Sequence, residues 1–522
     1  MEIEYWVSDL PLPITIPAGS AGSAGSWRLA DAPVEPLRRL YVDTFDWAIY
    51  LVGATLEWRR TAGHSMLIWS GLDQPAETLV QAISAAPAFP TDLPPGPLRT
   101  RLLKTVSCRR LLPMMWIDTD RRRLSLRDAD DRQVARLTLD ESRFQDPRGG
   151  QEGDLLPRLR IRPKRGQEDL VAATLTACQG ERGLRPATTP ILLEALTAVG
   201  RRPADYSSKL DFRLDPLARA DQVTKEILLR LLATLEANLD GARANLDTEF
   251  LHDLRVATRR TRSALGQIRG VFPAAELAHF KDGFAWLQQV TGPVRDLDVY
   301  LLQFDAYEQS LPASLRPHLE PLRVFLSSRY AAEQGRLADA LGAARFAQLM
   351  ADWRVFLTAS AAPLAPTPNG ARPIKEVVDD RIRALVKRVR REGRAIRSDS
   401  RPEDLHELRK SCKKLRYLME FFQSLYSKDD IRGLISLMKA LLDNLGDYQD
   451  LAVQAAHLRD WAQQMRDEHA AQTDTLLAVG ALIGNLLARR ERARAAFDEV
   501  FSGFSSAENQ LAFRTVFALV PA

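Results

Sequence analysis

The pattern of hydrophobic and polar positions changes about 215 residues into the chain. Before that point, short segments such as 38–46, 54–60 and 133–140 alternate apolar and polar side chains between Gly, Pro and Asp turns. A period of two is typical of half-buried strands. After that point, segments such as 220–239 and 249–272 repeat apolar residues with the 3.6-residue period of amphipathic helices. The pattern predicts a multidomain α+β chain, with strands first and helices afterwards.

The helical part contains two copies of one unit. Residues 251–262 read LHDLRVATRRTR and residues 405–416 read LHELRKSCKKLR, 154 positions further on. The same offset relates TGPVRDLDV at 291–299 to LGDYQDLAV at 445–453. Two matches at one offset indicate an internal duplication. A segment rich in Pro and small residues, 359–370, separates the copies.

Each copy places basic residues along one side of its motif helix. These positions fall within an arc of roughly 80° at about 100° per residue, and they form a stripe about 15 Å long opposite an apolar stripe. The stripe residues are His252, Arg255, Arg259 and Arg262 in the first copy and His406, Arg409, Lys413 and Arg416 in the second. Arg260, Lys410 and Lys414 widen the two stripes.

A charged helix face is usually only a solvated surface. Here like charges stack at spacings of three and four residues without compensating acids, which costs about a few tenths of a kcal/mol per pair. A polyanion along the stripes would supply the missing counter-charge, and arginine forks suit phosphate oxygens. We therefore expect a phosphate-rich ligand, contacted also by His252 and His406. No second His or carboxylate shares their helix face, so a metal site is not expected there.

Composition and charge limit the classes of protein and the cellular compartments that this chain fits. The 522 residues are 45% hydrophobic and 27% charged, with a net charge of only +5, so the basic stripes matter more than the overall charge. Cys108, Cys178 and Cys412 form no CxxC motif, which favours a reducing cytoplasm over a disulfide scaffold or structural zinc. The start lacks a signal-peptide pattern, and the apolar stretch 476–488 is short of a membrane span. We expect a cytoplasmic protein with no membrane partner.

The repeated LHxLR helix and its downstream motif resemble the CHAD domain, the "conserved histidine α-helical domain", over roughly 220–510. The resemblance implies two four-helix bundles related by pseudo-twofold symmetry, at 215–362 and 371–520. It also implies a basic cleft that binds inorganic polyphosphate and is lined by the stripe residues of both copies. Arg295 of the downstream motif is expected to join this lining, and Gln449 stands at its position in the second copy.

Residues 1–214 are similar to a CYTH domain, a triphosphate tunnel metalloenzyme. The similarity rests on EIE at 2–4, YVDTFD at 41–46, the strand that ends at 56–59 and SSK at 207–209. It implies an antiparallel β barrel whose bore holds acids for Mg²⁺ or Mn²⁺ and basic residues for the triphosphate.

This sequence departs from the tunnel pattern where the metal would be held. Trp6 stands in place of a lysine, and RLRIRPKRG at 158–166 stands where acids are usual, which introduces Arg158, Arg160 and Arg162. Arginine stays protonated and cannot ligate a cation. We expect a degenerate barrel with no catalytic residue and no required metal, and Mg²⁺ or Mn²⁺ would matter only in an active tunnel. The residues that persist as a residual anion or metal site are Glu2, Glu4, Arg59 and Lys209.

These features predict a polyphosphate-binding protein that acts in a granule-associated or scaffolding role. The main alternative is a metal-dependent inorganic triphosphatase or polyphosphatase that works in the tunnel, which the new arginines oppose. A third interpretation is nucleic-acid binding by the same basic face. Single-strand binders interleave aromatic residues with cations, and only Tyr417 lies at the edge of a stripe. Base-specific recognition is therefore not expected. Non-specific competition by DNA or RNA is expected from electrostatics, and the sequence indicates no particular protein partner.

Overall fold

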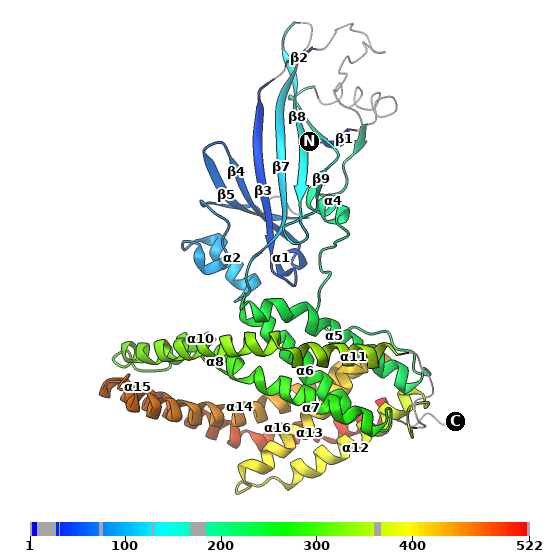
Figure 1. Ribbon diagram of the computed structural model, residues 1–522, viewed down its shortest axis with the longest axis vertical. Helices are drawn as coiled ribbons and strands as arrows, with labels where there is room; N and C mark the ends of the chain where they lie inside the picture. The colour runs from blue at the N-terminus through cyan, green and yellow to red at the C-terminus, as the bar shows by residue number, and fades with distance from the viewer. Residues whose placement is uncertain are drawn as a thin grey trace. The chain divides into compact units, whose positions relative to one another are not determined.

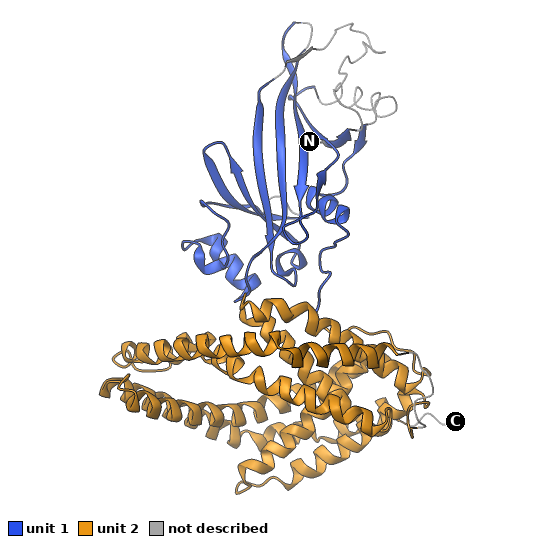
Figure 2. Cartoon of the chain, viewed as in Figure 1, with its two compact units in different colours: residues 1–207 blue, residues 208–522 orange. Residues whose placement is uncertain are grey.

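The alternating segments of the first part form strands, and the periodic segments of the second part form helices (Figure 1). The computed structural model describes residues 3–7, 28–30, 32–72, 77–127, 130–167, 184–359 and 367–518. The chain divides into two compact units, residues 1–207 and residues 208–522 (Figure 2). The predicted α+β class, with an antiparallel sheet before a helical region, is confirmed.

The division falls a few residues before the predicted boundary at 214. In the second unit, the carbonyl of Leu210 accepts a hydrogen bond from Nε2 of Gln423 at 3.3 Å. The amide of Leu214 donates to Oγ of Ser424, also at 3.3 Å. These contacts hold residues 208–214 on the helical unit rather than on the sheet.

The first unit is built on a sheet whose strand pairings are all antiparallel among the described residues. Its order is β11-β1-β10-β8-β7-β3-β4-β5-β6, and β2 and β9 pair with β7 and β8. The strands are β1 (Ile3–Val7), β2 (Arg28–Ala30), β3 (Val34–Asp43), β4 (Ala54–Thr61), β5 (His64–Gly71), β6 (Leu79–Ala82), β7 (Leu112–Arg127), β8 (Gln133–Gln145), β9 (Glu152–Asp154), β10 (Arg158–Pro163) and β11 (Leu184–Pro186). The helices of this unit are α1 (Ala48–Leu51), α2 (Pro97–Val106) and α4 (Ile191–Ala198).

The two faces of this sheet differ in polarity because side chains alternate along each strand. On one face, Leu159 and Ile161 of β10 pack with Tyr5 of β1 in a buried apolar cluster. Arg158 and Arg160 of the same strand therefore point to the opposite face. We call this opposite surface the polar face; its residues include Glu4, Arg39, Thr119, Asp140, Ser142, Arg158 and Arg160.

The helices of the second unit repeat in order, as the duplicated motif predicts. The first copy comprises α5 (Ala220–Arg243), α6 (Thr248–Gln267), α7 (Ala274–Val290), α8 (Gly292–Leu302), α9 (Phe304–Gln309), α10 (Glu320–Gly342) and α11 (Ala344–Thr358). The second comprises α12 (Ile374–Ala395), α13 (Pro402–Phe421), α14 (Lys428–Asp467), α15 (Thr473–Ala495), α16 (Phe497–Phe504) and α17 (Ala507–Val516). The pairs α5 and α12, α6 and α13, and α7 and α14 each begin 154 residues apart. Within the described residues, no helix has both the length and the apolar character needed to cross a membrane.

The copies differ where the first one breaks a helix that the second continues. Pro293 lies in the first turn of α8, and a proline lacks the N–H that a continuous helix would need. At the matching position the second copy has Asp447, and α14 runs on for 40 residues. Both copies contribute to one apolar cluster, which includes Leu297, Tyr300 and Phe304, then Leu322 and Leu326, and from the second copy Leu451, Leu458, Leu482 and Leu486.

Candidate functional site

The two cationic stripes lie on α6 and α13, which pack against each other. The Oδ1 atom of Asp247 accepts from the amides of Glu249 and Phe250, at 2.9 and 3.3 Å, and this cap begins α6. Pro402 occupies the first position of α13, where its missing N–H is no loss. Burial of the leucine stripes of both helices, such as Leu254 and Leu408, leaves the basic stripes on the surface of the unit.

One hollow beside these helices is lined by both charges and has a volume of about 560 Å³. We call it the mixed hollow. Its basic residues are Lys209, His252, Arg259, Arg260, Arg409, Lys413 and Arg416. Its carboxylates are Asp253, Glu420, Asp443, Asp447 and Asp450, most of them supplied by α14.

A second hollow, of about 470 Å³, shares Arg259, Lys413 and Tyr417 with the first. We call it the cationic hollow, because its charged lining consists of cations alone. These are Arg259, Arg262, Lys281, Lys410, Lys413 and Lys414. The remaining lining is small or polar, apart from the Tyr417 ring. Six cations without a carboxylate among them give this hollow a stronger attraction for an anion than the mixed hollow has.

Several stripe cations have carboxylate partners, which corrects the expectation that the stripes lack compensating acids. Arg409 donates to both carboxylate oxygens of Asp450, at 3.0 and 2.9 Å. Nε of Arg416 lies 2.6 Å from Oε1 of Glu420. A third pair joins Lys410 to Glu407, with 2.7 Å between Nζ and Oε1. The first two of these pairs line the mixed hollow, so much of its positive charge is neutralised within the protein.

Lys413 lies between the two hollows among other cations. Burial lowers the pKa of Lys413 to about 8, and the charges of Arg409 and Arg259 add to the effect. Burial likewise lowers the pKa of Lys414, with further contributions from Arg388 and Lys410. A bound anion would reverse these shifts because it favours the protonated form of both amines.

Three of the predicted cleft residues line neither hollow. Arg255 turns to α7, where its Nη1 donates to the carbonyl of Gln288 at 3.0 Å and to Oγ1 of Thr291 at 2.8 Å. Arg295 lies 3.9 Å from the buried carboxylate of Asp298. His406 is exposed on α13, outside both linings, whereas His252 is half-buried and lines the mixed hollow.

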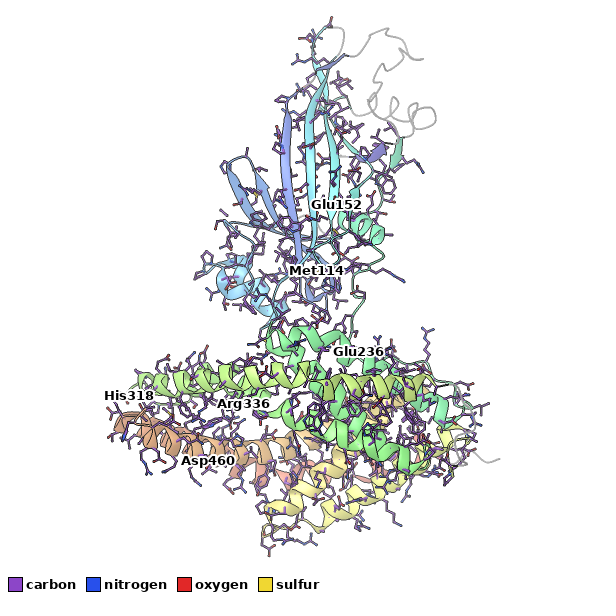
Figure 3. All side chains as sticks on the ribbon, in the orientation of Figure 1. Met114, Glu152, Glu236, His318, Arg336 and Asp460 are labelled. Carbon is purple, nitrogen blue, oxygen red and sulfur yellow. The ribbon has the colours of Figure 1, made fainter. Side chains whose placement is uncertain are left out.

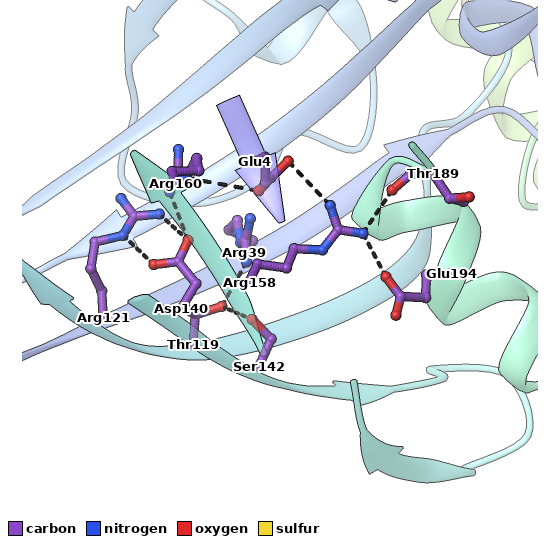
Figure 4. A network of polar contacts seen from close by, with 10 residues as sticks. All are labelled: Glu4, Arg39, Thr119, Arg121, Asp140, Ser142, Arg158, Arg160, Thr189 and Glu194. Atoms are coloured by element: carbon purple, nitrogen blue, oxygen red, sulfur yellow. Dashed lines mark hydrogen bonds and ion pairs between the residues drawn. The ribbon is translucent and has the colours of Figure 1, made fainter. Parts of the chain in front are cut away.

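The polar face of the first unit holds a network of ion pairs (Figure 4). The Arg158 guanidinium lies 2.5 Å from Oε2 of Glu194 and 3.4 Å from Oε2 of Glu4, and it donates to the carbonyl of Thr189 at 2.7 Å. Arg160 donates to Oδ2 of Asp140 at 2.7 Å. The polar face therefore does contain carboxylates, but Glu4, Glu194 and Asp140 are each paired with an arginine.

Asp140 is the most heavily bonded of these acids. Arg121 donates to its two oxygens at 2.7 and 2.8 Å, in addition to the bond from Arg160. Burial alone would raise the pKa of Asp140, but the bonds and charges of Arg121 and the charge of Arg160 hold it below its usual value. Arg39 extends the network through Thr119, whose Oγ1 it reaches at 2.6 Å.

The structure does not bring the residues of the predicted residual anion or metal site together. Glu4 contacts Arg158 and Arg160, whereas Arg59 is bonded to Glu57 at 2.6 Å. Lys209 belongs to the second unit and lines the mixed hollow, and Glu2 lies outside the described residues. Arg162, two residues further along β10, is exposed.

A divalent metal does not fit the described part of the polar face. The oxygens of Glu4 and Asp140 are already paired with guanidinium groups, which stay protonated and cannot themselves ligate a cation. Within the described ranges, no group of three His, Cys, Asp or Glu side chains is arranged to hold a metal ion.

Sequence reasoning missed the residues that reach these sites from neighbouring elements. Lys281 of α7 and Gln267 at the end of α6 line the cationic hollow. Glu420 lies one turn beyond the stripe of α13, and i+4 spacing from Arg416 was the available signal. Asp140 and Arg121 lie on strands whose period of two could have placed them on one face.

Residues 226–459 match the model of the CHAD domain family. The helical unit therefore contains a CHAD domain, which confirms the prediction from the duplicated motif. The chain is 28% identical over 309 residues to an uncharacterized protein of Mycobacterium tuberculosis, with 54% of this chain and 55% of that protein covered. The chain thus spans about half the length of the curated relatives that it matches.

Solved structures are similar to each part of the chain. The crystal structure of the CHAD domain from the plant Ricinus communis is 26% identical with a TM-score of 0.48, covering 57% of this chain and 96% of that one. HpAC1 from Hippeastrum, a protein described by its dominant triphosphatase activity, is 15% identical with a TM-score of 0.25. It covers 40% of this chain and 99% of its own.

Proposed function

We propose that this chain binds inorganic polyphosphate and that the cationic hollow is the main binding site. The observation that carries the proposal is a hollow of about 470 Å³ whose charged lining consists of six cations and no carboxylate. A polyphosphate chain carries one negative charge per internal phosphate and fits such a lining without a metal. The match of residues 226–459 to the CHAD family supports the same ligand class.

The mixed hollow has a secondary part in this proposal. A phosphate there would meet Asp443, Asp447 and Asp450, and all three are exposed acids that line the hollow. Repulsion from these carboxylates offsets the attraction of Arg260 and Arg416. Polyphosphate therefore occupies the cationic hollow first and reaches the mixed hollow only past Lys413.

The duplication supplies a matched pair of variants that tests this site. Arg262 and Lys414 line only the cationic hollow, and their counterparts 154 residues away, Arg416 and Arg260, line only the mixed hollow. Polyphosphate binding by the full chain is measured by titration calorimetry for Arg262→Gln/Lys414→Gln and for Arg416→Gln/Arg260→Gln. The first pair should weaken binding by about tenfold or more, and the second by clearly less.

A control separates site binding from net charge. Arg336→Ala/Arg466→Ala removes two exposed arginines of the same unit, at the α10 position labelled in Figure 3 and near the end of α14. Binding should change by less than about twofold in this variant. Equal losses in all three variants would mean that only overall charge matters, and the proposed site would then be wrong.

The cellular role that we propose is that of a cytoplasmic, granule-associated or scaffolding protein. Binding without turnover suits such a role, and arginines on the acids of the polar face argue against hydrolysis there. A fluorescent fusion of the full chain should colocalise with stained polyphosphate granules, and a Lys413→Met fusion should be diffuse. A diffuse wild-type fusion in granule-containing cells would contradict this role.

A further inference from the structure

The duplication relates the two hollows to each other, but it does not preserve their charge. A shift of 154 positions carries Arg262 of the cationic hollow onto Arg416 of the mixed hollow. The same shift carries Gly266 onto Glu420 and Lys410 onto Val256. Relative to the cationic hollow, the mixed hollow has therefore gained the carboxylate of Glu420 and lost the amine that corresponds to Lys410. A polyanion is attracted more strongly toward the cationic hollow.

Cations continue beyond the cationic hollow on that side. Nη2 of Arg381, on α12, donates to Oε1 of Gln267 at 2.7 Å, and Gln267 lines the hollow. Nε of Arg269 lies 3.3 Å from the carbonyl of Gly266, another lining residue. Arg388 lies two turns after Arg381 on the same side of α12, about 10 Å further along the axis. We call Arg269, Arg381 and Arg388 the basic rim.

The charges around this rim are predominantly positive. Burial lowers the pKa of Arg381, and the positive charges of Arg269 and Arg388 lower it further. Two carboxylates face the same region: Glu392, 2.6 Å from Nε of Arg388, and Glu407, which pairs with Lys410. Three rim cations with Lys410 and Lys414 exceed these two acids, so an unneutralised positive surface remains.

No residue of the basic rim has a basic counterpart 154 positions away. The α5 positions that match Arg381 and Arg388 are Ile227 and Thr234, and both are buried. The position of the second copy that matches Arg269 is Gln423. The rim therefore extends the cationic hollow, and the duplication does not repeat it beside the mixed hollow.

We infer that a long polyphosphate leaves the cationic hollow over the basic rim, and that this rim makes the protein prefer long chains to short ones. The inference rests on the proposed function and adds a chain-length preference to it. A tripolyphosphate can be satisfied inside the hollow. Only a longer chain can also reach Arg381 and Arg388, and each phosphate that pairs with a rim cation releases a counter-ion.

The test compares tripolyphosphate with long-chain polyphosphate on the full chain. Arg381→Gln/Arg388→Gln should weaken long-chain binding by about tenfold and lower the slope of log affinity against log salt by about two. Tripolyphosphate affinity, measured by competition, should change by less than about twofold. The matched control is Arg383→Gln/Arg390→Gln on the same helix, whose side chains donate instead to the Phe517 carbonyl and to Gln510. This control should leave both affinities within about twofold.

The outcomes separate the rim from the site itself. If the rim variant weakens the binding of both ligands equally, or if the control variant has the same effect as the rim variant, the proposed role of the rim in chain-length preference is refuted. Long-chain binding that Lys413→Met weakens and the rim variant leaves unchanged would refute the rim and keep the proposed function. A wild-type chain that binds neither ligand would refute the proposed function. If the double variant unfolds by circular dichroism, Arg388→Gln alone must show the selective loss for long chains, because Arg388 is exposed and bonded only to Glu392 among the described contacts.

Discussion

Arg409 of α13 and Asp450 of α14 form a two-pronged ion pair, with distances of 3.0 and 2.9 Å between their nitrogen and oxygen atoms. Gly446 lies one turn before Asp450, and a Cβ there would make only an ordinary van der Waals contact with Nη2 of Arg409, at 3.4 Å. The aspartate of the second downstream motif therefore holds an arginine of the stripe.

Removal of this aspartate should strengthen polyphosphate binding. In Asp450→Asn, Arg409 loses its counter-charge and the mixed hollow gains one positive charge. Affinity should rise several-fold and the salt slope should steepen by about one, as measured by titration calorimetry at several salt concentrations. Stability should change by less than about 1 kcal/mol, because Asp450 is 59% exposed. Weaker binding in this variant would mean that Asp450 orients Arg409 for the ligand.

Lys413 should make binding depend on pH in the alkaline range. Its pKa is about 8 in the protein without ligand, and a bound phosphate raises it. Below about pH 7 the amine is charged in both states, so the affinity is independent of this group. As pH rises from about 8 to 10, binding must take up a proton, and affinity should fall by up to about tenfold per pH unit.

Arginine at this position should reduce that dependence while keeping the charge. Lys413→Arg stays protonated throughout, so its affinity should fall less steeply than that of the wild type from pH 8 to 10, and Lys414 accounts for the fall that remains. Lys410→Arg, in the same hollow but exposed, serves as the control and should retain the wild-type profile. An unchanged alkaline fall in Lys413→Arg would assign the titration to another group.

The polar-face network should stabilise the first unit through Arg158. Its side chain is only 5% exposed, and Arg158→Met leaves Glu194 and Glu4 without their shared guanidinium. The free energy of unfolding should fall by about 2–4 kcal/mol in calorimetry. Arg162→Met changes the same residue type at an exposed position of β10 and should stay within about 0.5 kcal/mol. Equal effects of the two variants would contradict the role of the network.

Phosphate release from tripolyphosphate should remain at the rate of the buffer with Mg²⁺ or Mn²⁺. Arg158 and Arg160 hold the acids that a metal would need, and the metal would have to place its positive charge between two guanidinium groups. Turnover on the order of 1 s⁻¹ that Glu4→Gln abolishes would show an active tunnel instead.

Periodicity alone placed the duplicated helices and most of the basic residues that line the two hollows. It could not show that Arg255 turns toward Gln288 and Thr291, because a helical wheel gives the direction of a side chain and not the groups that it meets there. Arg295, which was assigned from the family resemblance, lies near Asp298. Periodicity also overstated the positive charge of the stripes, since Asp450 comes from another helix. Pairing across helices depends on tertiary packing, which a single-helix pattern does not contain.

The strand pattern predicted which face of the sheet a side chain lies on, but not the partners that it meets there. Alternation put Arg158 and Arg160 on one side of β10, and the register of β1 with β10 sets Glu4 opposite Arg160. The sequence could not tell that this side would be neutral, because Glu194 arrives from α4 and Asp140 from β8. Lys209 was assigned to the barrel because SSK at 207–209 resembles part of the tunnel pattern, yet its segment packs on the helical unit.

The shared apolar cluster of the two copies has a consequence for synthesis of the protein. Leu297 and Leu322 of the first copy are buried together with Leu451 and Leu482 of the second. When the ribosome has made only the first copy, these leucines lack the partners that the second copy supplies. The apolar cluster of the first copy is therefore completed only after α14 and α15 have been synthesised.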